Sequence, residues 1–280
     1  MRVFPERTKR RLGWQFRVGP LGEVETSLSG DELNFRFFTA TGKEVPAITA
    51  DEMREVDRIA TQETGPNLYQ MMENAGRNLA LLAIELLGEN WQKAKIVVLA
   101  GSSGNGGGGI CAARHLANRD VDVRLCLAQP ECLGEVSGWQ RKIFQSTRGQ
   151  EIDRSQLPEE RPNLVLDALI GYGLKSAPDA GMAQLIRWAN SSLSPILALD
   201  LPSGLNATTG ETSGTCIAPK WTMTLALPKT GLLPGRTGEL YLADIGIPQA
   251  TYRHLNLKYE SPFESRFWVR LHCRKVLGLT

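Results

Sequence analysis

The sequence is poor in the residues that cross-link extracellular domains or hold metal ions. Its 280 residues include only five cysteines, which are scattered, odd in number and never spaced as Cys-x-x-Cys. Such a set argues against a disulfide framework and a zinc site, and it favours a reducing compartment. We therefore expect a cytoplasmic protein. Histidine is scarcer still, with three residues and no ligand pair, so chemistry that needs a histidine base is not favoured.

The sequence also lacks an excess of charge and a long apolar run. The 32 lysines and arginines nearly balance the 30 aspartates and glutamates. This balance argues against a nucleic-acid partner. No segment approaches 18 consecutive apolar residues, so we expect no transmembrane helix and no membrane partner. The hydrophobic content of 42% is that of an ordinary globular protein.

The two ends of the chain differ from its middle. The first 19 residues hold six arginines or lysines and one acid. An arginine-rich, acid-poor start is typical of organelle transit peptides, so an organelle is the alternative location. We expect residues 1–46 to be a basic N-terminal extension, either poorly packed or used for targeting. We expect residues 251–280 to be a C-terminal appendage, which leaves 47–250 as the folded domain.

The middle of the chain alternates between helical patterns and short apolar runs. Thr49 and Glu52 form a capping box that opens one helix. Apolar residues then recur at three- and four-residue steps from Leu68 to Leu86, and Gly88 ends this second helix. Runs typical of buried strands occupy 96–100, 121–127, 164–166, 196–199, 222–227 and 240–243. The alternation predicts an α/β fold, a mostly parallel sheet with helices on both faces.

A glycine-rich segment follows the first of these strands. Five of the six residues from Gly104 to Gly109 are glycine, which lets the backbone approach a ligand closely. The helix that follows offers free N–H groups and the positive end of its dipole, so the segment predicts phosphate or nucleotide binding. A flexible surface loop is the alternative. The spacing also matches the dinucleotide fingerprint, but no acid lies at the end of the next strand, so an ordinary dehydrogenase is less favoured.

Aspartates stand at two other strand ends. Asp167 precedes a glycine turn, and Asp200 precedes Leu-Pro-Ser-Gly. In open parallel sheets, ligands bind beyond the carboxyl ends of the strands. Two carboxylates at this edge would repel each other unless a cation or a proton intervened. Each aspartate alone is compatible with a turn cap, but together with the glycine segment they predict a functional site.

Six segments, taken together, resemble one family. They are Ile48–Met53, Met72–Gly76, Ala100–Leu116, Asp167–Gly173, Asp200–Gly204 and Ala243–Pro248. Their order and spacing are similar to those of the N-terminal domain of the YjeF family, the NAD(P)H-hydrate epimerases. The resemblance implies a three-layer αβα sandwich with a Rossmann-like sheet.

The same resemblance implies an activity and a set of site residues. The activity is epimerisation between the R and S forms of hydrated NADH and NADPH (NADHX and NADPHX), a step of nicotinamide nucleotide repair. A separate NAD(P)HX dehydratase would be the pathway partner, and a homodimer is left open. The implied cofactor is a potassium ion held by Asn105, Asp167 and Ser203. The implied substrate contacts are Gly104, Asn105, Gly106, Gly107, Gly108, Gly171, Tyr172, Gly173, Leu174, Lys175, Ser176, Ala177 and Asp200.

The chemistry of the implied reaction selects a catalytic residue. Epimerisation at a carbon that carries both nitrogen and hydroxyl can pass through an iminium-like cation, to which water adds again. A carboxylate that protonates the hydroxyl and stabilises the cation suits this step, and we assign the role to Asp200. One departure leaves an alternative open. The family sequence Asn-Asn-Gly-Gly-Asp-Gly has lost its first asparagine at Gly104 and its acid at Gly108, which is compatible with a weak or inactive epimerase fold that only binds or interacts.

Overall fold

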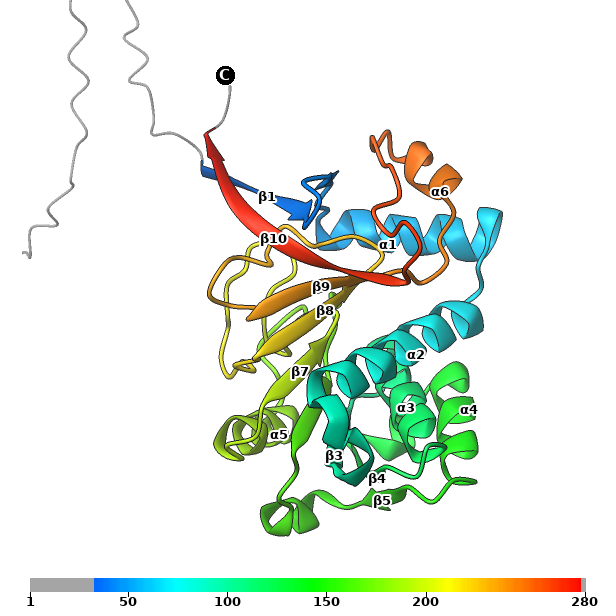
Figure 1. Cartoon of the computed structure of the whole chain (residues 1–280), viewed down its shortest axis with the longest axis vertical. Coiled ribbons are helices and arrows are strands. Elements are labelled where there is room, and N and C mark those ends of the chain that lie inside the picture. Colours follow the sequence, from blue (N-terminus) through cyan, green and yellow to red (C-terminus); the bar gives the residue numbers. More distant parts are fainter. Residues whose placement is uncertain (1–32, 278–280) are drawn as a thin grey trace, which may run out of the picture. The chain divides into compact units, whose positions relative to one another are not determined.

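The computed structural model describes residues 33–277 and contains one ten-stranded sheet (Figure 1). The strand order is β2-β1-β10-β9-β8-β7-β6-β3-β4-β5. The strands are β1 Leu33–Thr39, β2 Glu44–Val45, β3 Lys95–Ala100, β4 Asp122–Leu127, β5 Gln150–Ile152, β6 Leu164–Ala168, β7 Ile196–Leu199, β8 Trp221–Leu225, β9 Glu239–Ala243 and β10 Trp268–Leu277. Every pair from β9 across to β5 is parallel, and the pairs that involve β1, β2 and β10 with their neighbours are antiparallel.

Helices pack on both faces of the sheet. The α-helices are α1 Ala50–Ile59, α2 Leu68–Leu87, α3 Gly104–Ala117, α4 Glu135–Phe144, α5 Ala180–Ser191 and α6 Gln249–His254. Shorter helical segments are the π-helical turn Ala60–Thr64 and the 3₁₀ turns Gly88–Lys93, Pro130–Cys132 and Arg154–Glu159. None of the helices within residues 33–277 is long and apolar enough to cross a membrane.

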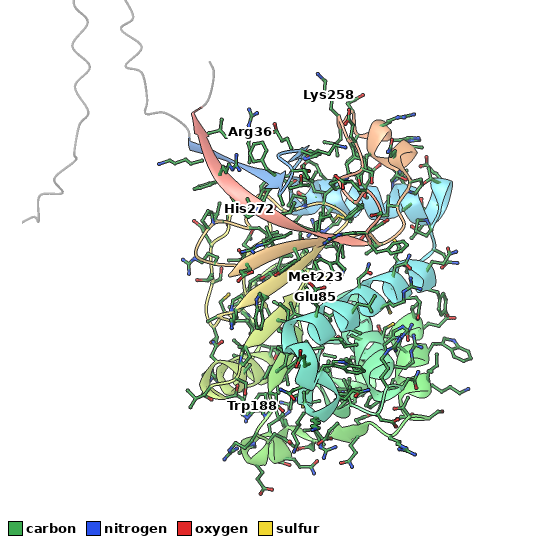
Figure 2. The ribbon with its side chains drawn as sticks, viewed as in Figure 1. Arg36, Glu85, Trp188, Met223, Lys258 and His272 are labelled. Atoms are coloured by element: carbon green, nitrogen blue, oxygen red, sulfur yellow. The ribbon has the colours of Figure 1, made fainter. Side chains whose placement is uncertain are left out.

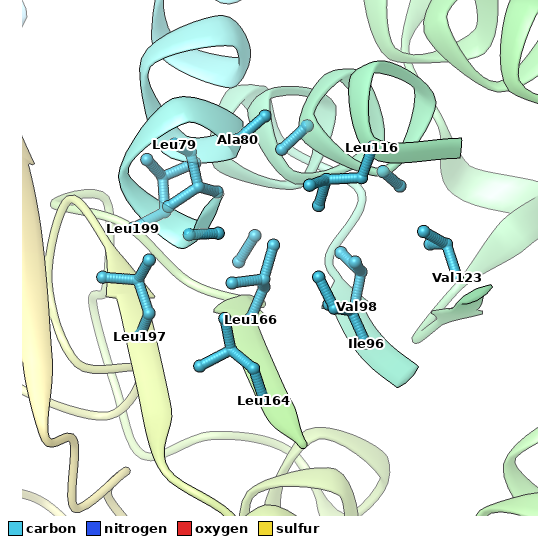
Figure 3. Close-up of a cluster of buried hydrophobic side chains, with 14 of the residues drawn as sticks. Leu79, Ala80, Ile96, Val98, Leu116, Val123, Leu164, Leu166, Leu197 and Leu199 are labelled. Atoms are coloured by element: carbon cyan, nitrogen blue, oxygen red, sulfur yellow. The ribbon is translucent and has the colours of Figure 1, made fainter. Parts of the chain in front are cut away.

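The central strands are buried on both faces, as their continuous apolar runs predict. Val98 and Leu166 join the core beneath α2 and α3 (Figure 3), whereas Val97 and Val165 join the core beneath α5. A third core packs α1, through Met53 and other side chains, against β1, β9 and β10. The expected α/β sandwich with a mostly parallel, Rossmann-like sheet is therefore confirmed.

Both expected domain boundaries are wrong. The residues that follow 250 were expected to form an appendage, but β10 lies inside the sheet, hydrogen-bonded to β9 on one side and to β1 on the other. Residues 33–46 are likewise part of the core, where the exposed fractions of Phe37 and Val45 are only 1% and 2%. Residues 1–32, with the basic segment, lie outside the described residues, so the targeting expectation stays a prediction.

The pattern of β10 explains why its role was missed. Leu271 points into the core, while the flanking Arg270 and His272 lie on the opposite, solvent-facing side. His272 pairs with Phe38 of β1, and Arg36 lies on the same strand pair (Figure 2). A strand whose outward positions are polar looks like a polar tail when one of its two partners, β1, lies more than 200 positions away in the sequence.

Candidate active site

A cavity of about 500 Å³ opens at the carboxyl ends of β3, β6, β7 and β8, between α1, α2 and α3. Its lining includes eight of the predicted substrate contacts: Gly104, Asn105, Gly108, Gly171, Tyr172, Gly173, Lys175 and Asp200. The other five, which do not line this cavity, are Gly106, Gly107, Leu174, Ser176 and Ala177. Methionine and leucine side chains from α1 and α2 form an apolar wall. Such a mixture of apolar wall and convergent polar groups is typical of a ligand site.

The glycine-rich segment is helical rather than a loop. The helix α3 begins at Gly104, so the expected loop is reduced to residues 101–103. A Cβ atom at Gly106 would lie 1.9 Å from the Gly101 carbonyl oxygen, and one at Gly109 would lie 2.4 Å from Ala168 Cβ. Glycine is therefore required because α3 packs tightly against the strand ends. The expected free N–H groups remain, since the first turn of any helix leaves its amides without intrahelical partners.

Asp167 and Ser203 lie together beneath the strand ends. Asp167 is fully buried in β6, and its Oδ2 accepts a hydrogen bond from the Ser203 N–H at 2.9 Å. Its Oδ1 accepts from the Ser203 hydroxyl at 2.6 Å and from the Leu169 N–H at 3.2 Å. Burial raises the pKa of Asp167 to about 6, although these hydrogen bonds favour the carboxylate. Neither Asp167 nor Ser203 lines the cavity.

The amide of Asn105 is buried beside the cavity. Both Nδ2 and Oδ1 are removed from solvent, and neither makes a hydrogen bond within the described part of the chain. Its Cγ would lie 3.2 Å from a Cβ placed on Gly171, and Asp200 Oδ2 would lie 3.1 Å from the same point. Unsatisfied buried amides are costly, and they often mark a place where a ligand or ion belongs. Amide and carboxylate oxygens are the hard donors that suit potassium, so the chemistry of Asn105 and Asp167 is compatible with the expected ion.

Asp200 forms a buried ion pair with Lys229. The Lys229 ammonium donates to Asp200 Oδ1, and the side chains of the two residues are 1% and 4% exposed. The same ammonium donates to the Leu225 carbonyl at 2.9 Å. Asp200 has a φ of 67°, a conformation that is strained for any residue with a Cβ and that occurs preferentially at functional sites.

Lys229 lines the cavity but was not among the residues predicted from the sequence. It follows β8 in the segment Leu227–Gly231, just as Asp200 follows β7. Ligands bind beyond the carboxyl ends of parallel strands, and this applies to Lys229 as it does to Asp200. A lysine is usually solvated, and nothing local in the sequence indicates that this one is fully buried. Ile48 holds the segment in place, because its N–H donates to the Pro228 carbonyl and its carbonyl accepts from the Thr230 N–H, both at 3.0 Å.

Asp57 of α1 is a second missed residue. It lines the cavity and accepts a hydrogen bond from the Tyr172 hydroxyl. Burial raises the pKa of Asp57, and the hydrogen bond from Tyr172 opposes this effect. Asp57 directly follows the buried Val56 in α1. From the sequence alone, such a position indicates only a solvent-exposed helix residue.

These groups together can perform acid–base chemistry next to an anion site. A carboxylate and an ammonium face one cavity, where one can stabilise a developing positive charge and the other can donate a proton. The first turn of α3 offers N–H groups to phosphate at the same cavity. This combination suits a phosphorylated ligand whose reacting carbon develops positive charge.

Comparisons with known proteins agree with this site. A family model described as YjeF-related protein N-terminus matches residues 68–231. The chain is 52% identical, over 84% of its own length and 97% of the relative, to an NAD(P)H-hydrate epimerase of Dehalogenimonas lykanthroporepellens. It is 34% identical to the NAD(P)H-hydrate epimerase of Weissella koreensis, over 72% of this chain and 91% of that one.

Two further matches differ in what they cover. The bifunctional NAD(P)H-hydrate repair enzyme Nnr of Moorella thermoacetica is 37% identical over 82% of this chain, which spans only 45% of that enzyme. The crystal structure of the yeast protein ynu0 superposes with a TM-score of 0.69 at 20% identity, covering 81% of this chain and all of that one. This second match supports the fold. By its family model and its relatives, the chain belongs to the family of YjeF-related protein N-termini.

Proposed function

We propose that this protein is an NAD(P)H-hydrate epimerase, which interconverts the R and S forms of NADHX and NADPHX. The observation that carries the proposal is the buried Lys229–Asp200 pair, which faces a cavity of about 500 Å³ beside the first turn of α3. The relatives named as epimerases support it, since one of them is matched over 97% of its length. A separate NAD(P)HX dehydratase would consume the S form, in keeping with the bifunctional repair enzymes among the relatives.

Different residues bind the dinucleotide and carry out the reaction. The phosphates of the dinucleotide would meet the N–H groups of Gly104 and Asn105, and the hydrated ring would lie against the apolar wall near Asp200. Cleavage of the ring carbon–oxygen bond releases the hydroxyl group as water when Lys229 donates a proton. Asp200 stabilises the iminium-like cation that remains. Water then adds to the other face of the ring, and the released proton returns to Lys229.

This assignment changes the role first given to Asp200. In the pair, the Lys229 ammonium is the hydrogen-bond donor and the Asp200 carboxylate is the acceptor, so Asp200 suits charge stabilisation better than proton donation. The lysine is the member of the pair that carries a proton. Asp200 stays the catalytic residue that contacts the developing cation, and Lys229 joins it as the proton donor.

A potassium ion would be held by Asn105, Asp167 and Ser203. The amide of Asn105, which has no hydrogen-bond partner among residues 33–277, and the buried carboxylate of Asp167 support this part of the proposal. When bound, the ion would offset negative charge from Asp167 and from the substrate phosphates. It would also give the Asn105 oxygen the partner that residues 33–277 do not supply.

Gly108 is, with Gly104, one of two positions at which this chain departs from the family sequence. It lies inside α3 and lines the cavity, so no carboxylate reaches the site from this position. We propose that turnover persists, because the Lys229–Asp200 pair is intact and supplies both the proton and the negative charge. The alternative is a protein that binds the dinucleotide without turnover.

Epimerisation of purified R-NADHX separates these alternatives. The conversion to S-NADHX is followed by chromatography with the parent protein, with the Glu89→Gln variant on the exposed surface, and without protein. We expect both proteins to accelerate conversion well beyond the protein-free rate. Binding of the dinucleotide with no acceleration would favour the non-catalytic alternative and contradict the proposal.

A further inference from the structure

Tyr172 touches both members of the catalytic pair and one residue outside it. Its backbone N–H donates to Asp200 Oδ2 at 3.1 Å, and the Lys229 ammonium lies 5.9 Å from the centre of its ring. Its hydroxyl donates to Asp57 Oδ2. One residue thus joins α1, through its side-chain hydroxyl, to Asp200, through its backbone N–H.

The segment that carries Tyr172 has little structure of its own. It lies between β6 and α5, and glycines flank the tyrosine at 171 and 173. Such a segment gains its conformation from contacts with rigid neighbours. The Ile170 N–H, two residues before the tyrosine, donates to the Ser203 hydroxyl at 2.9 Å, and the tyrosine side chain is the further anchor that sets where the Tyr172 N–H lies.

Asp57 is held rigidly, in contrast. The helix α1 begins at a complete capping box, and Met53 and Val56 anchor it in the core with exposed fractions of 2% and 0%. Ile48, just before the helix, is bonded on both sides to the segment that carries Lys229. Asp57 is therefore fixed relative to Lys229 and gives Tyr172 a stationary acceptor.

We propose that Asp57 is a positioning residue, which acts through the Tyr172 hydroxyl to keep the Tyr172 N–H on Asp200 Oδ2. The carboxylate of Asp200 is then held from both sides, by Lys229 on Oδ1 and by Tyr172 on Oδ2. A carboxylate held in this way cannot rotate away from the developing cation, which is the form of preorganisation that electrostatic catalysis requires. The effect on turnover rests on the proposed function, but the effect on Asp200 does not.

Four variants and one control test the effect on turnover. Asp57→Ala removes the acceptor, Tyr172→Phe removes only the hydroxyl, and a third variant combines them, whereas Asp57→Asn keeps an acceptor oxygen. Glu55→Ala on the exposed side of α1 is the control. We expect Asp57→Ala and Tyr172→Phe each to lower kcat by about tenfold to hundredfold, the scale of a misplaced catalytic group, with little change in KM.

The double variant and Asp57→Asn test whether Asp57 acts on Asp200 through the Tyr172 hydroxyl. The double variant should lose no more than the larger single loss, because both changes break the same link. Asp57→Asn should retain most of kcat. Additive losses, a change confined to KM, or an Asn variant as impaired as Ala would overturn the inference.

A second readout does not depend on turnover. In protein labelled with ¹³C at the aspartate carboxyl groups, the Asp200 signal is assigned from its loss in Asp200→Asn. It should shift in Asp57→Ala and in Tyr172→Phe but stay in place in Glu55→Ala. If the parent protein shows no epimerase turnover, the proposed function fails while this shift still supports the positioning role. An unmoved Asp200 signal in Tyr172→Phe, which keeps the ring and the fold, overturns that role whatever the turnover.

Discussion

Lys229 and Asp200 meet beyond the ends of β8 and β7 as an ion pair that solvent hardly reaches, with side-chain exposures of 1% and 4%. Removing two charges from water is expensive, and their attraction offsets the cost only when geometry and further hydrogen bonds are favourable. Here the ammonium has the Leu225 carbonyl and the carboxylate has the Tyr172 N–H as additional partners. A pair of this kind is weak evidence for stability and stronger evidence for function.

Breaking the pair on either side should cost both stability and turnover. Asp200→Asn and Lys229→Met each leave one buried charge without its partner, so each should lower the free energy of unfolding by about 3–5 kcal/mol. Turnover should fall by about 100-fold or more in each, the scale of a positioned acid or charge stabiliser. Urea unfolding and the epimerase assay provide the two measurements.

The double variant Asp200→Asn/Lys229→Met separates the two effects. It contains no unpaired charge, so its unfolding free energy should exceed that of Asp200→Asn alone, while its turnover stays low. If the double variant were less stable than either single variant, the pairing energy would not be the cause of the single losses.

Potassium should stabilise the protein through Asn105. Because the amide has no hydrogen-bond partner within the described residues, Asn105→Ala should unfold no more easily than the parent in tetramethylammonium chloride. The parent should gain thermal stability when potassium replaces tetramethylammonium, and the variant should lose most of this gain. Equal melting temperatures of the parent in the two salts would remove the ion from the proposal.

The active-site edge was predictable from the sequence to the extent that its residues follow buried strands. Asp167, Asp200 and Gly104 stand after apolar runs whose parallel pairing follows from strand–helix alternation. Lys229 obeys the same rule, yet it was missed because its burial depends on α1 and on Asp200, which are distant in sequence. Tyr172 was expected to contact the substrate, but its link to Asp57 exists only in the folded protein.

The limits of the fold prediction have the same cause. Central strands can be predicted from their continuous apolar runs, because both of their faces are buried. The pair β1 and β10 is half exposed and antiparallel, and its two members lie at opposite ends of the chain. The helical start of α3 was hidden for another reason. Glycine disfavours helix interiors, and the run is explained by close neighbours of its middle positions, among them Gly101, Met72 and Ala168.

Phe37 tests whether β1 belongs to the core. Its side chain is 1% exposed among apolar residues of β9, β10 and α1, so Phe37→Ala should lower the free energy of unfolding by about 3–5 kcal/mol. Phe38 on the opposite face is the matched control, and Phe38→Ala should cost clearly less. If both variants lost the same small amount of unfolding free energy in urea, residues 33–39 would not contribute to the core.

Glu73 should make the free energy of unfolding depend on pH in the acidic range. Its burial would raise the carboxyl pKa, but hydrogen bonds from Arg114, His115 and Gln140 outweigh this effect and lower the pKa to about 2. A carboxyl group whose folded pKa is lowered contributes stability above its unfolded pKa of about 4.3, and this contribution is lost as pH falls towards 2.

The variant Glu73→Gln tests the direction in which the Glu73 contribution to stability changes with pH. It should be less stable than the parent at pH 7, and the difference should shrink steadily from about pH 4.5 to about pH 2. Glu89→Gln, at an exposed position, should follow the parent throughout. A stability difference that stayed constant over this range would show that Glu73 contributes through its shape and not through its charge.

Gly108 is the position at which a restored acid would show whether the family carboxylate is needed. Its backbone is not in the left-handed region, so an aspartate there carries no backbone strain. A Cβ atom would lie 2.8 Å from the end of the Leu199 side chain, a clash that a rotation of Leu199 can relieve. Gly108→Ala therefore measures the steric cost alone, and the double variant Gly108→Asp/Leu199→Val removes most of it.

Gly108→Asp should raise the epimerisation rate only when potassium is present. Its carboxylate would join Asp200 in the same cavity, and like charges there need a cation for compensation. With potassium we expect a gain of about tenfold over Gly108→Ala, equivalent to about 1.4 kcal/mol of transition-state stabilisation. With tetramethylammonium the added repulsion should cancel the gain. If Gly108→Asp and Gly108→Ala turned over at the same rate in both salts, the Lys229–Asp200 pair would be sufficient for the chemistry and the missing acid would be irrelevant to it.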